Sequence, residues 1–450
     1  MTAAAAPLLL RGGTVLTLDR EATVLPGSDL LAIDGRIAAI GPRLEAPADA
    51  RVLEVTDHWL IPGLIQGHLH LGQSLFRGLA EERRLLAWLR ERIWPLEAAL
   101  DDEAAHVAGA LGAAECLLGG TTTIQDIGLG PGIDGLLAAI AESGLRGFVG
   151  LCLMDGGEGL PAALATPAPE TLARAERLGR QWDGAAGGRL RWALNPRFIL
   201  SASDELWEGI VGLSRRTGWP IHTHALEQRE ETAAVRRAKG GRDEIEFFRD
   251  RGLLELDLRL AHGVWIEAQH RPLLAERRTA VVHCPGSNLK LGSGVARIAR
   301  LAAAGVPLGI GADGAACNNG LDALAEVRLA AGLQSALEGP GSFPALAALR
   351  LATSEGARAL RLEADIGALE VGKRADVVVL RLDRPHLAAS PGADPHDLLV
   401  WGGAGAAVRH VAIDGRLEVE DGRLTRIDLP ELLARARSMA MRVARRAGLL

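Results

Sequence analysis

Eight short apolar segments divide the middle of the chain, and a helical pattern follows each of them. They are strand-like because they are brief, rich in aliphatic residues and bounded by glycine, proline or polar residues. The segments are Leu64–His68, Thr121–Asp126, Gly147–Met154, Leu190–Asn195, Pro220–His224, Leu258–His262, Thr279–His283 and Pro307–Gly311. Strands that alternate with helices in this number predict an α/β fold, a (β/α)8 TIM barrel rather than an open sheet.

Both ends of the chain have a different pattern, that of β-structure with tight turns. The strand-like stretches are Leu8–Asp19, Leu30–Gly41, Ala50–Leu60, Ala375–Leu380, Val408–Ile413 and Leu417–Val419. Asp414-Gly415 and Asp421-Gly422 predict hairpin turns near the second end. We therefore expect the two ends to pack together as one small sheet domain. The predicted parts are 1–61 and 366–427 for this domain, 62–365 for the barrel, and an amphipathic C-terminal helix over 428–450.

Composition excludes several classes of function. A chain of 450 residues, 48% of them hydrophobic, can bury a large core, and its net charge of -6 argues against a nucleic-acid partner. The apolar runs are far shorter than the ~20 residues of a membrane helix, so no membrane association is expected. Met1–Leu10 has no basic segment of a signal peptide. Four scattered cysteines (Cys116, Cys152, Cys284 and Cys317) form no CxxC pair, which favours reduced thiols and a cytoplasmic protein.

The most specific motif is Pro62-Gly63-Leu64-Ile65-Gln66-Gly67-His68-Leu69-His70. Because side chains alternate along a strand, His68 and His70 project from the same side. Neutral imidazole is a favoured ligand of zinc and related divalent metals. A pair of histidines at the end of the first barrel strand therefore predicts a metal site at the mouth of the barrel.

Two other strand ends supply further ligands. The fifth strand ends in His222-Thr223-His224, and Glu227 follows three residues later, so we choose His224 as the ligand and leave His222 as a supporting or packed residue. Asp313 follows the eighth strand. Together with His68 and His70 this set leaves a coordination position open for water, which is typical of a catalytic metal site.

The sequence favours one metal over two. A second ion is commonly bridged by a modified lysine from a middle strand, whereas Lys239 and Lys290 lie outside the strand ends. Histidine and carboxylate ligands suit zinc, iron(II) or manganese, of which zinc is our first expectation. His283 could line the pocket, support Asp313 or simply pack in the core, and these alternatives stay open.

These motifs resemble the amidohydrolase superfamily, and longer strings narrow the resemblance. Leu75–Glu82, Trp88-Leu89, Ile93–Glu97, Ser287–Gly294 and Gly314–Asn319 are similar to the methylthioadenosine/S-adenosylhomocysteine deaminase and chlorohydrolase group. The resemblance covers nearly the whole chain. It implies a β-sandwich made of both chain ends, one metal, and a homo-oligomer, a dimer or tetramer.

The resemblance also implies roles for individual residues. It assigns His68, His70, His224 and Asp313 as metal ligands, Glu227 as the proton shuttle to the ring nitrogen, and His262 as the residue that positions the water. Asp313 would also accept the water's proton. By the same resemblance Glu97 would hold ribose hydroxyls and Trp88 would line the pocket.

Two departures leave the substrate open. Leu151 stands where homocysteine-binding members carry an arginine, which disfavours a substrate with an amino-acid carboxylate. In addition, Gln73, Arg197 and Phe198 resemble the base-holding residues of guanine deaminases. An arginine donates hydrogen bonds only, so it suits a ring carbonyl better than the bare nitrogens of adenine.

The sequence thus predicts a metal-dependent hydrolase that acts on a small heteroaromatic amine. The first expectation is a deaminase of an aminated purine or a 5′-modified adenine nucleoside. Alternatives are a guanine, 8-oxoguanine or pterin deaminase, an s-triazine hydrolase with chloride or an alkylamine as leaving group, and a two-metal hydrolase of cyclic amides. A non-catalytic scaffold is the alternative outside catalysis, although such a protein would be expected to have lost ligands.

Overall fold

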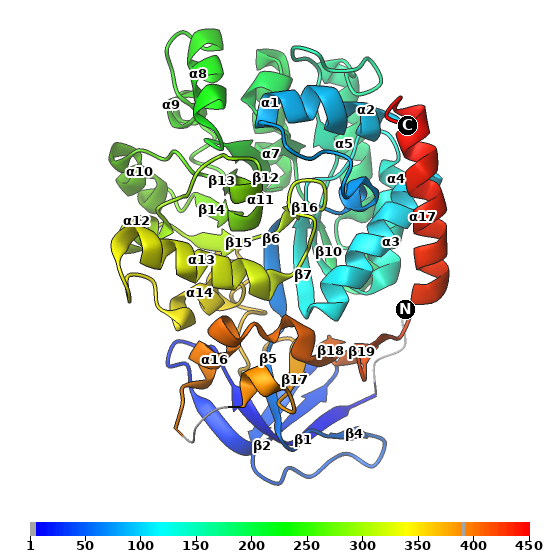
Figure 1. Ribbon diagram of the computed structural model, residues 1–450, viewed down its shortest axis with the longest axis vertical. Helices are drawn as coiled ribbons and strands as arrows, with labels where there is room; N and C mark the ends of the chain where they lie inside the picture. The colour runs from blue at the N-terminus through cyan, green and yellow to red at the C-terminus, as the bar shows by residue number, and fades with distance from the viewer. Residues whose placement is uncertain (1–5, 389–391) are drawn as a thin grey trace.

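The computed structural model describes residues 6–388 and 392–450, and places strands from residues 8–62 and 377–424 in one β-domain below a larger α/β part (Figure 1). The predicted parts 1–61 and 366–427 include residues 1–5 and 389–391, which lie outside the described residues. No helix in the described ranges has the length and apolarity needed to span a bilayer.

The α/β part contains parallel strands near every predicted position. The strands are β6 (Leu64–His70), β7 (Thr121–Asp126), β8 (Arg146–Val149), β10 (Leu190–Trp192), β12 (Ile221–Ala225), β13 (Leu258–His262), β14 (Ala280–His283) and β15 (Leu308–Ile310). They form two parallel sheets, one in the order β10-β8-β7-β6 and one in the order β12-β13-β14-β15. Every residue of β6 is buried, as in a parallel strand covered on both faces.

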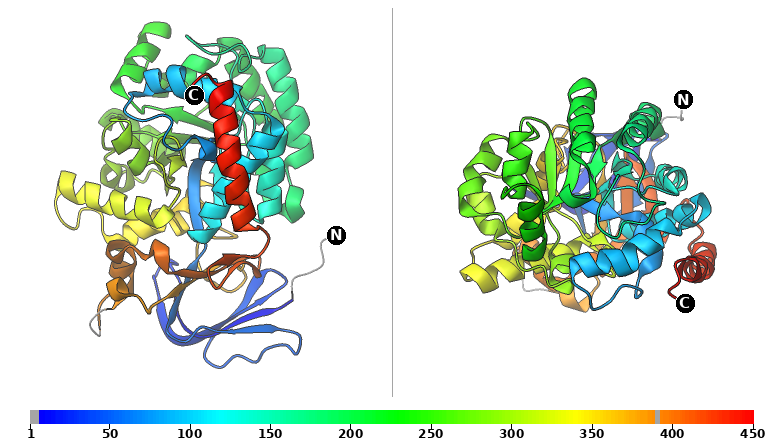
Figure 2. Two further views of the ribbon diagram at one scale, coloured as in Figure 1. Left: turned by 45° about the vertical axis from the view of Figure 1, so that its right-hand side comes forward. Right: turned by 90° about the horizontal axis from the view of Figure 1, so that it is seen from above.

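Helices connect these strands and cover them on the outside, as the view from above shows (Figure 2). They are α3 (Asp102–Leu118), α4 (Ile133–Ser143), α5 (Ala168–Trp182), α7 (Asp204–Thr217), α8 (Arg229–Ala238), α9 (Glu244–Asp250), α10 (Arg271–Glu276), α11 (Pro285–Lys290), α12 (Ile298–Ala303), α13 (Ala323–Glu338), α14 (Ala345–Leu351) and α15 (Ser354–Ala359). Several begin at a side chain that caps the first turn. Asp101, Ser203 and Asp322, for example, accept backbone N–H groups of α3, α7 and α13.

The two parallel sheets approach each other at two seams. At one seam Leu194 forms a parallel bridge with Ile221 of β12. At the other, β16 (Asp313–Gly314) follows β15 and pairs with the end of β6. A Cβ at Gly311 would lie 2.4 Å from the carbonyl oxygen of His68, so the residue after β15 must be glycine for this approach.

The β-domain is a single hydrogen-bonded sheet assembled from both ends of the chain. Its order is β20-β19-β18-β17-β5-β1-β2-β3, and β4 pairs with β1. The strands are β1 (Leu8–Leu16), β2 (Val24–Ile33), β3 (Arg36–Gly41), β4 (Arg51–Glu54), β5 (His58–Pro62), β17 (Val377–Arg381), β18 (Val408–Ile413), β19 (Arg416–Glu420) and β20 (Arg423–Leu424). At the joint β5 and β17 pair antiparallel, so strands from before and after the α/β part lie in one sheet.

Some predicted strands are divided in the structure. Leu30–Gly41 contains a hairpin, because Asp34-Gly35 adopts left-handed φ angles of 50° and 76° between β2 and β3. The third and fourth barrel strands are interrupted before β9 (Cys152–Leu153) and β11 (Asn195–Pro196). At the C-terminus, α17 (Leu429–Arg446) packs along α3.

Candidate active site

Four predicted ligands converge at the carboxyl ends of β6, β12 and β15. His68, His70, His224 and Asp313 each offer an atom that lies within 4.8 Å of the others. Nε2 of His68 and Nε2 of His70 each lie 3.2 Å from Oδ1 of Asp313, and Nε2 of His70 lies 3.1 Å from Nε2 of His224. All are buried except His224, which is partly buried. The set thus brings together three imidazole nitrogens and one carboxylate oxygen, a combination that could hold a divalent metal.

The outer nitrogens of two of these rings have partners that fix their tautomers. Nδ1 of His224 donates to the carbonyl oxygen of Arg197 at 2.6 Å, which leaves the lone pair on Nε2. Nδ1 of His222 donates to the carbonyl of Arg259 at 3.1 Å, so its Nε2 accepts from Nδ1 of His68 at 2.8 Å. His222 therefore supports His68, which is the first of the two alternatives, a supporting or a packed residue, that the sequence left open.

This arrangement fits a divalent metal. Nε2 of His68 is buried and has no hydrogen-bond partner, although its lone pair points into the cluster. Buried polar atoms are rarely left without a partner, and metal-binding histidines are usually held through their second nitrogen in this way. Burial lowers the pKa values of His68, His70 and His224, which keeps the imidazoles neutral, the form that binds a metal.

The backbone adopts left-handed φ angles at three positions around the cluster. Leu226, His262 and Asp313 have φ angles of 55°, 72° and 63°. Aspartate and histidine enter this region more readily than most residues, so the strain is clearest at Leu226. Such conformations cost about 1–3 kcal/mol each and occur where the surrounding structure imposes them, often at functional sites. They turn the chain sharply at the strand ends, so that His262 and the residues beside Leu226 face the cavity.

Glu227 faces the cluster from the loop after β12. Its side chain is buried, and Oε2 lies 3.5 Å from Nε2 of His262, whereas Oε1 accepts a hydrogen bond from Ser293 at 2.9 Å. Burial raises the pKa of Glu227, which favours the protonated carboxyl. Burial also pushes the pKa of Asp313 upward, but the neighbouring histidines outweigh it and hold that pKa well below its usual range. The two carboxyl groups therefore have opposite tendencies, one as proton donor and one as anion.

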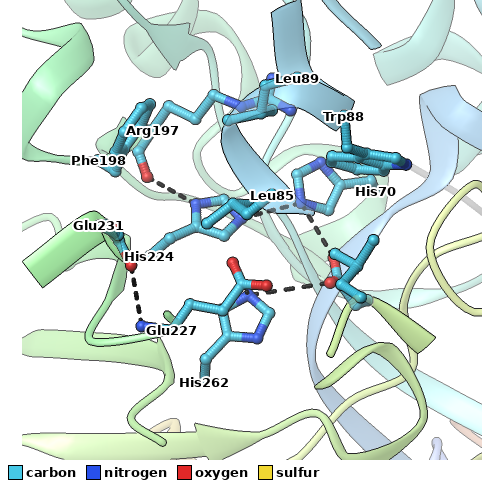
Figure 3. A pocket seen from close by; sticks show the side chains of 12 residues that line it. His70, Leu85, Trp88, Leu89, Arg197, Phe198, His224, Glu227, Glu231 and His262 are labelled. Carbon is cyan, nitrogen blue, oxygen red and sulfur yellow. Dashed lines mark hydrogen bonds and ion pairs between the residues drawn. The ribbon is translucent and has the colours of Figure 1, made fainter. Parts of the chain in front are cut away.

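A pocket opens in front of these groups (Figure 3). The rings of His70, His224 and His262 point toward this space, with Glu227 between the last two. Its remaining walls are Leu85, Trp88, Leu89, Arg197, Phe198, Glu231, Leu291 and Asp313. The cavity thus joins a polar floor to largely apolar walls, as small-molecule sites do.

The five predicted substrate-binding residues fall into two groups. Trp88, Arg197 and Phe198 line the cavity, whereas Gln73 and Glu97 lie behind Arg197. The carboxylate of Glu97 accepts hydrogen bonds from Gln73 at 2.9 Å and from NH1 of Arg197 at 2.7 Å. Residues that the sequence had connected with two different substrates therefore form one buried hydrogen-bonded group.

Other residues near the site were not singled out from the sequence for a role. Asn288 accepts from Nδ1 of His262 at 2.9 Å, and Ser287 donates to Oδ2 of Asp313 at 2.7 Å. Both belong to the string Ser287–Gly294, so the only signal was membership of that string. His283 is buried with neither ring nitrogen hydrogen-bonded, and no hydrogen bond connects it to Asp313 among the described residues. The predicted support of Asp313 comes from Ser287 instead.

Comparison with known proteins agrees with the geometry. The amidohydrolase family matches residues 59–417, which include every strand end of the site. The chain belongs to the amidohydrolase family. As a member of that family it is a hydrolase, and the predicted resemblance is confirmed.

Curated relatives of this amidohydrolase are similar over nearly their full length. A 5-methylthioadenosine/S-adenosylhomocysteine deaminase of Symbiobacterium thermophilum is 36% identical over 97% of this chain and 99% of its own. A 5′-deoxyadenosine deaminase of Methanothermobacter thermautotrophicus is 35% identical over 90% of this chain and 95% of its own.

Two zinc-bound enzymes of known structure have the same fold as this chain. A zinc-bound adenosine deaminase of Xanthomonas campestris superimposes with a TM-score of 0.90, at 32% identity over 98% of this chain and 99% of its own. A zinc-bound atrazine chlorohydrolase of Arthrobacter aurescens gives a TM-score of 0.88, at 25% identity over 96% and 100% of the two chains.

Proposed function

We propose that this amidohydrolase is a metal-dependent deaminase of adenine nucleosides with a modified 5′ carbon. The reaction replaces the exocyclic amino group by the oxygen of water and releases ammonia. The observation that carries the proposal is the position of Glu227, a buried carboxyl with a raised pKa, opposite the cluster of His68, His70, His224 and Asp313. The names of the similar curated proteins support the substrate class.

We assign His68, His70, His224 and Asp313 as the ligands of one divalent metal, with zinc as the first expectation because two similar solved proteins contain it. Such an ion would lower the pKa of a coordinated water to about 7, far below its value in bulk water. No lysine lies in this cluster, since Lys239 pairs with Asp204 and Lys290 with Glu81. A single ion therefore agrees better with these residues than a bridged pair.

The protein's own residues would divide the proton transfers among them. Asp313, held as an anion, accepts the proton that the attacking water loses. Glu227, held protonated, donates its proton to the ring nitrogen beside the carbon under attack, which makes that carbon more electrophilic. Nδ1 of His262 donates to Asn288, so the lone pair is on Nε2. Nε2 can therefore accept a hydrogen bond from the incoming water and orient its oxygen. As the bond from carbon to the amino nitrogen breaks, the nitrogen takes the proton that Asp313 accepted from water and leaves as ammonia. The remaining hydroxyl proton returns to Glu227 as the carbonyl group forms, which restores both carboxyl groups.

We propose, as the family resemblance implies, that Glu97 binds the ribose. Glu97 lies behind Arg197, and its two carboxylate oxygens accept hydrogen bonds from Gln73 and Arg197, so contact with a ribose would require Arg197 to move aside. The charge of Arg197 is already compensated by Glu97, which makes this arginine a poor receptor for a free carboxylate. The apolar walls formed by Leu85, Trp88 and Leu89 suit a purine or an alkylthio group.

A second candidate is deamination of a guanine-like or pterin ring. It is favoured by one observation, that Arg197 and Phe198 line the cavity whereas Glu97 lies behind them. An s-triazine substrate, with chloride or an alkylamine as leaving group, is favoured by the similarity to the atrazine chlorohydrolase. The raised pKa of Glu227 argues for ammonia, because a poor leaving group needs ring protonation most.

We also propose that the two parallel sheets form one (β/α)8 barrel over 62–365 and that the sheet of both chain ends is a β-sandwich-like domain. Its predicted parts remain 1–61 and 366–427, with the helical segment 428–450. A homo-oligomer, a dimer or tetramer, and a cytoplasmic location remain predictions.

The test is ammonia release by the metal-loaded protein from a panel of ring amines. The panel holds adenosine, 5′-deoxyadenosine, methylthioadenosine, S-adenosylhomocysteine, guanine, 8-oxoguanine, isoxanthopterin, melamine and a chlorotriazine. We expect the fastest release from 5′-deoxyadenosine and methylthioadenosine, and slower release from S-adenosylhomocysteine. Release from guanine or isoxanthopterin alone would replace the nucleoside by the second candidate, and one metal per chain with no ammonia from any compound would overturn deamination.

A further inference from the structure

A chain of three buried polar side chains leads to Glu227 from outside the cavity. Gln228 donates through Nε2 to Oγ of Ser293 at 3.2 Å, and Ser293 donates to Oε1 of Glu227 at 2.9 Å. All three side chains are buried. Neither Gln228 nor Ser293 lines the cavity or belongs to the proposed metal site.

The direction of the hydrogen bonds in this chain is fixed at its far end. Nε2 of Gln228 also lies 3.0 Å from the carbonyl oxygen of Leu291, which can only accept. The amide nitrogen of Gln228 must therefore face Leu291 and Ser293. Because Ser293 accepts from Gln228, its single hydroxyl hydrogen is left for Glu227.

The loop itself is held by a separate set of contacts. Oε2 of Glu231 accepts the backbone N–H groups of Glu227 and Gln228, at 2.9 and 3.3 Å. The backbone oxygen of Ser293 accepts from Nε1 of Trp265 at 3.0 Å. These bonds use backbone atoms of Glu227, Gln228 and Ser293, so removing the serine hydroxyl leaves all of them in place.

We propose that Ser293, oriented by Gln228, is a positioning residue that places the proton of Glu227 on Oε2. Oε1 accepts the serine hydrogen, so it acts as the carbonyl oxygen of the carboxyl group. Oε2 then carries the proton and faces Nε2 of His262 at 3.5 Å. That nitrogen has its lone pair free, because Nδ1 of His262 donates to Asn288.

This role rests on the proposed function, since a placed proton matters only if Glu227 delivers it. Protonated carboxyl groups can rotate, and the wrong rotamer would point the proton at Ser293 instead of the substrate. The hydroxyl hydrogen of Ser293 opposes that rotation, because a proton on Oε1 of Glu227 would point at the hydrogen that Ser293 donates. The effect belongs to the protonation step and leaves substrate binding unchanged.

The kinetic test compares Ser293→Ala, Ser293→Thr, Gln228→Met and the double variant Ser293→Ala/Gln228→Met in metal-loaded protein. Loss of the hydroxyl should lower kcat about 10- to 100-fold, the loss expected for one hydrogen bond to an ionisable group. KM and metal content should stay at wild-type values, and threonine should restore most of kcat. Gln228→Met should have a smaller effect, and the double variant should be no slower than Ser293→Ala.

Ser214 is the matched control, because it is a buried serine whose hydroxyl donates to a backbone oxygen, that of Trp219, away from the site. Ser214→Ala should leave kcat unchanged. Wild-type kcat in Ser293→Ala would overturn the proposal, as would a double variant in which the two losses multiply.

Infrared spectroscopy gives a readout that needs no turnover. In metal-loaded protein below neutral pH, the difference between wild type and Glu227→Gln isolates the carboxyl stretch of Glu227. The band should move to higher wavenumber in Ser293→Ala, because its carbonyl oxygen loses a donor, and stay in place in Ser214→Ala. An unmoved band would overturn the positioning role. The expected shift with no ammonia from any substrate would overturn the proposed function alone.

Discussion

Two clusters of charged groups lie at opposite ends of the parallel strands, and they are built differently. At the mouth, the histidines around Asp313 carry nitrogens that have no hydrogen-bond partner, and Glu227 has a raised pKa. At the other end, Arg146 of β8 donates from Nε and NH2 to Asp376 at 2.9 and 3.2 Å, and from NH2 to Asp414 at 2.6 Å. Both acids belong to the sheet made of the two chain ends.

The difference separates groups placed to react from groups placed to hold the structure. Burial alone would lower the pKa of Arg146, but Asp376 and Asp414 outweigh it and raise that pKa above its ordinary value. The guanidinium group of Arg146 therefore keeps its charge. Among the described residues no lysine or arginine is paired with Glu227, whose nearest basic group is the imidazole of His262 at 3.5 Å, and burial favours the protonated carboxyl group. At the mouth, Glu227 has a raised pKa and some histidine nitrogens have no hydrogen-bond partner, whereas Arg146 at the joint between the two parts is hydrogen-bonded to two carboxylates.

The largest expected effect comes from Glu227→Gln. It should reduce kcat by about 10²- to 10⁴-fold, the usual contribution of a general acid, because glutamine has no carboxyl proton to donate. Metal content and thermal stability should not fall, since the group is buried without a paired cation. Ammonia release, metal analysis and thermal unfolding measure the three quantities.

The exposed Glu208 on α7 provides the control, and Glu208→Gln should behave as wild type. Normal turnover by Glu227→Gln would remove this residue from the mechanism. A large loss of bound metal would move it into the ligand set.

Arg146→Leu should have the opposite signature. It leaves the buried Asp376 without its cation, whereas Asp414 keeps Arg374, and breaking a buried pair costs about 3–5 kcal/mol of unfolding free energy. Denaturant unfolding should show this loss, while kcat measured on the folded fraction at low temperature stays near wild type. The exposed Arg191 lies at the same end of the strands, and Arg191→Leu should cost far less. A variant of Arg146 that is stable but inactive would contradict the division between the two clusters.

Glu326 on α13 allows a pH test of a buried carboxyl that supports the mouth. It accepts from the backbone N–H of Gly286 at 2.9 Å and from Asn318 at 2.8 Å, and burial raises its pKa to about 7. Because the folded state binds this proton more tightly than the unfolded state, stability is highest below the unfolded pKa and falls as the pH rises to about 7. The full loss is about 3 kcal/mol.

Glu326→Gln removes that titration. The unfolding free energy of wild type minus that of the variant should therefore fall between about pH 4.5 and 7 and be level above it. Denaturant unfolding of both proteins across this range measures the difference. A constant difference would mean that Glu326 is ionised throughout.

Much of this architecture could be predicted from the sequence because it depends on local patterns. Eight apolar segments with helices between them indicated the parallel strands, and the histidine pair of β6 identified the mouth. The sequence did not predict that the hairpin at Asp34-Gly35 divides one predicted strand or that another is interrupted before β9. A short apolar run does not show where strand pairing ends.

The contacts of the site were harder to predict than its members. His68, His70, His224 and Asp313 meet as expected, but the capture of Glu97 by Gln73 and Arg197 is a contact between residues 24 and 100 positions apart. No local pattern encodes such a contact. The choice of Ser287, rather than His283, as the partner of Asp313 likewise depends on how α11 packs against β16.

The smallest expected effect is that of Asp414→Asn, which weakens the joint without opening it. Asp414 is partly exposed, and its Oδ1 accepts from both Arg146 at 2.6 Å and Arg374 at 3.1 Å. Asparagine keeps an oxygen in that place and tolerates the left-handed φ of 49°. Asp376 still compensates Arg146, so the loss should be about 1 kcal/mol of unfolding free energy, with kcat unchanged. A loss as large as that of Arg146→Leu would mean that the charge of Asp414, rather than that of Asp376, holds the two parts together.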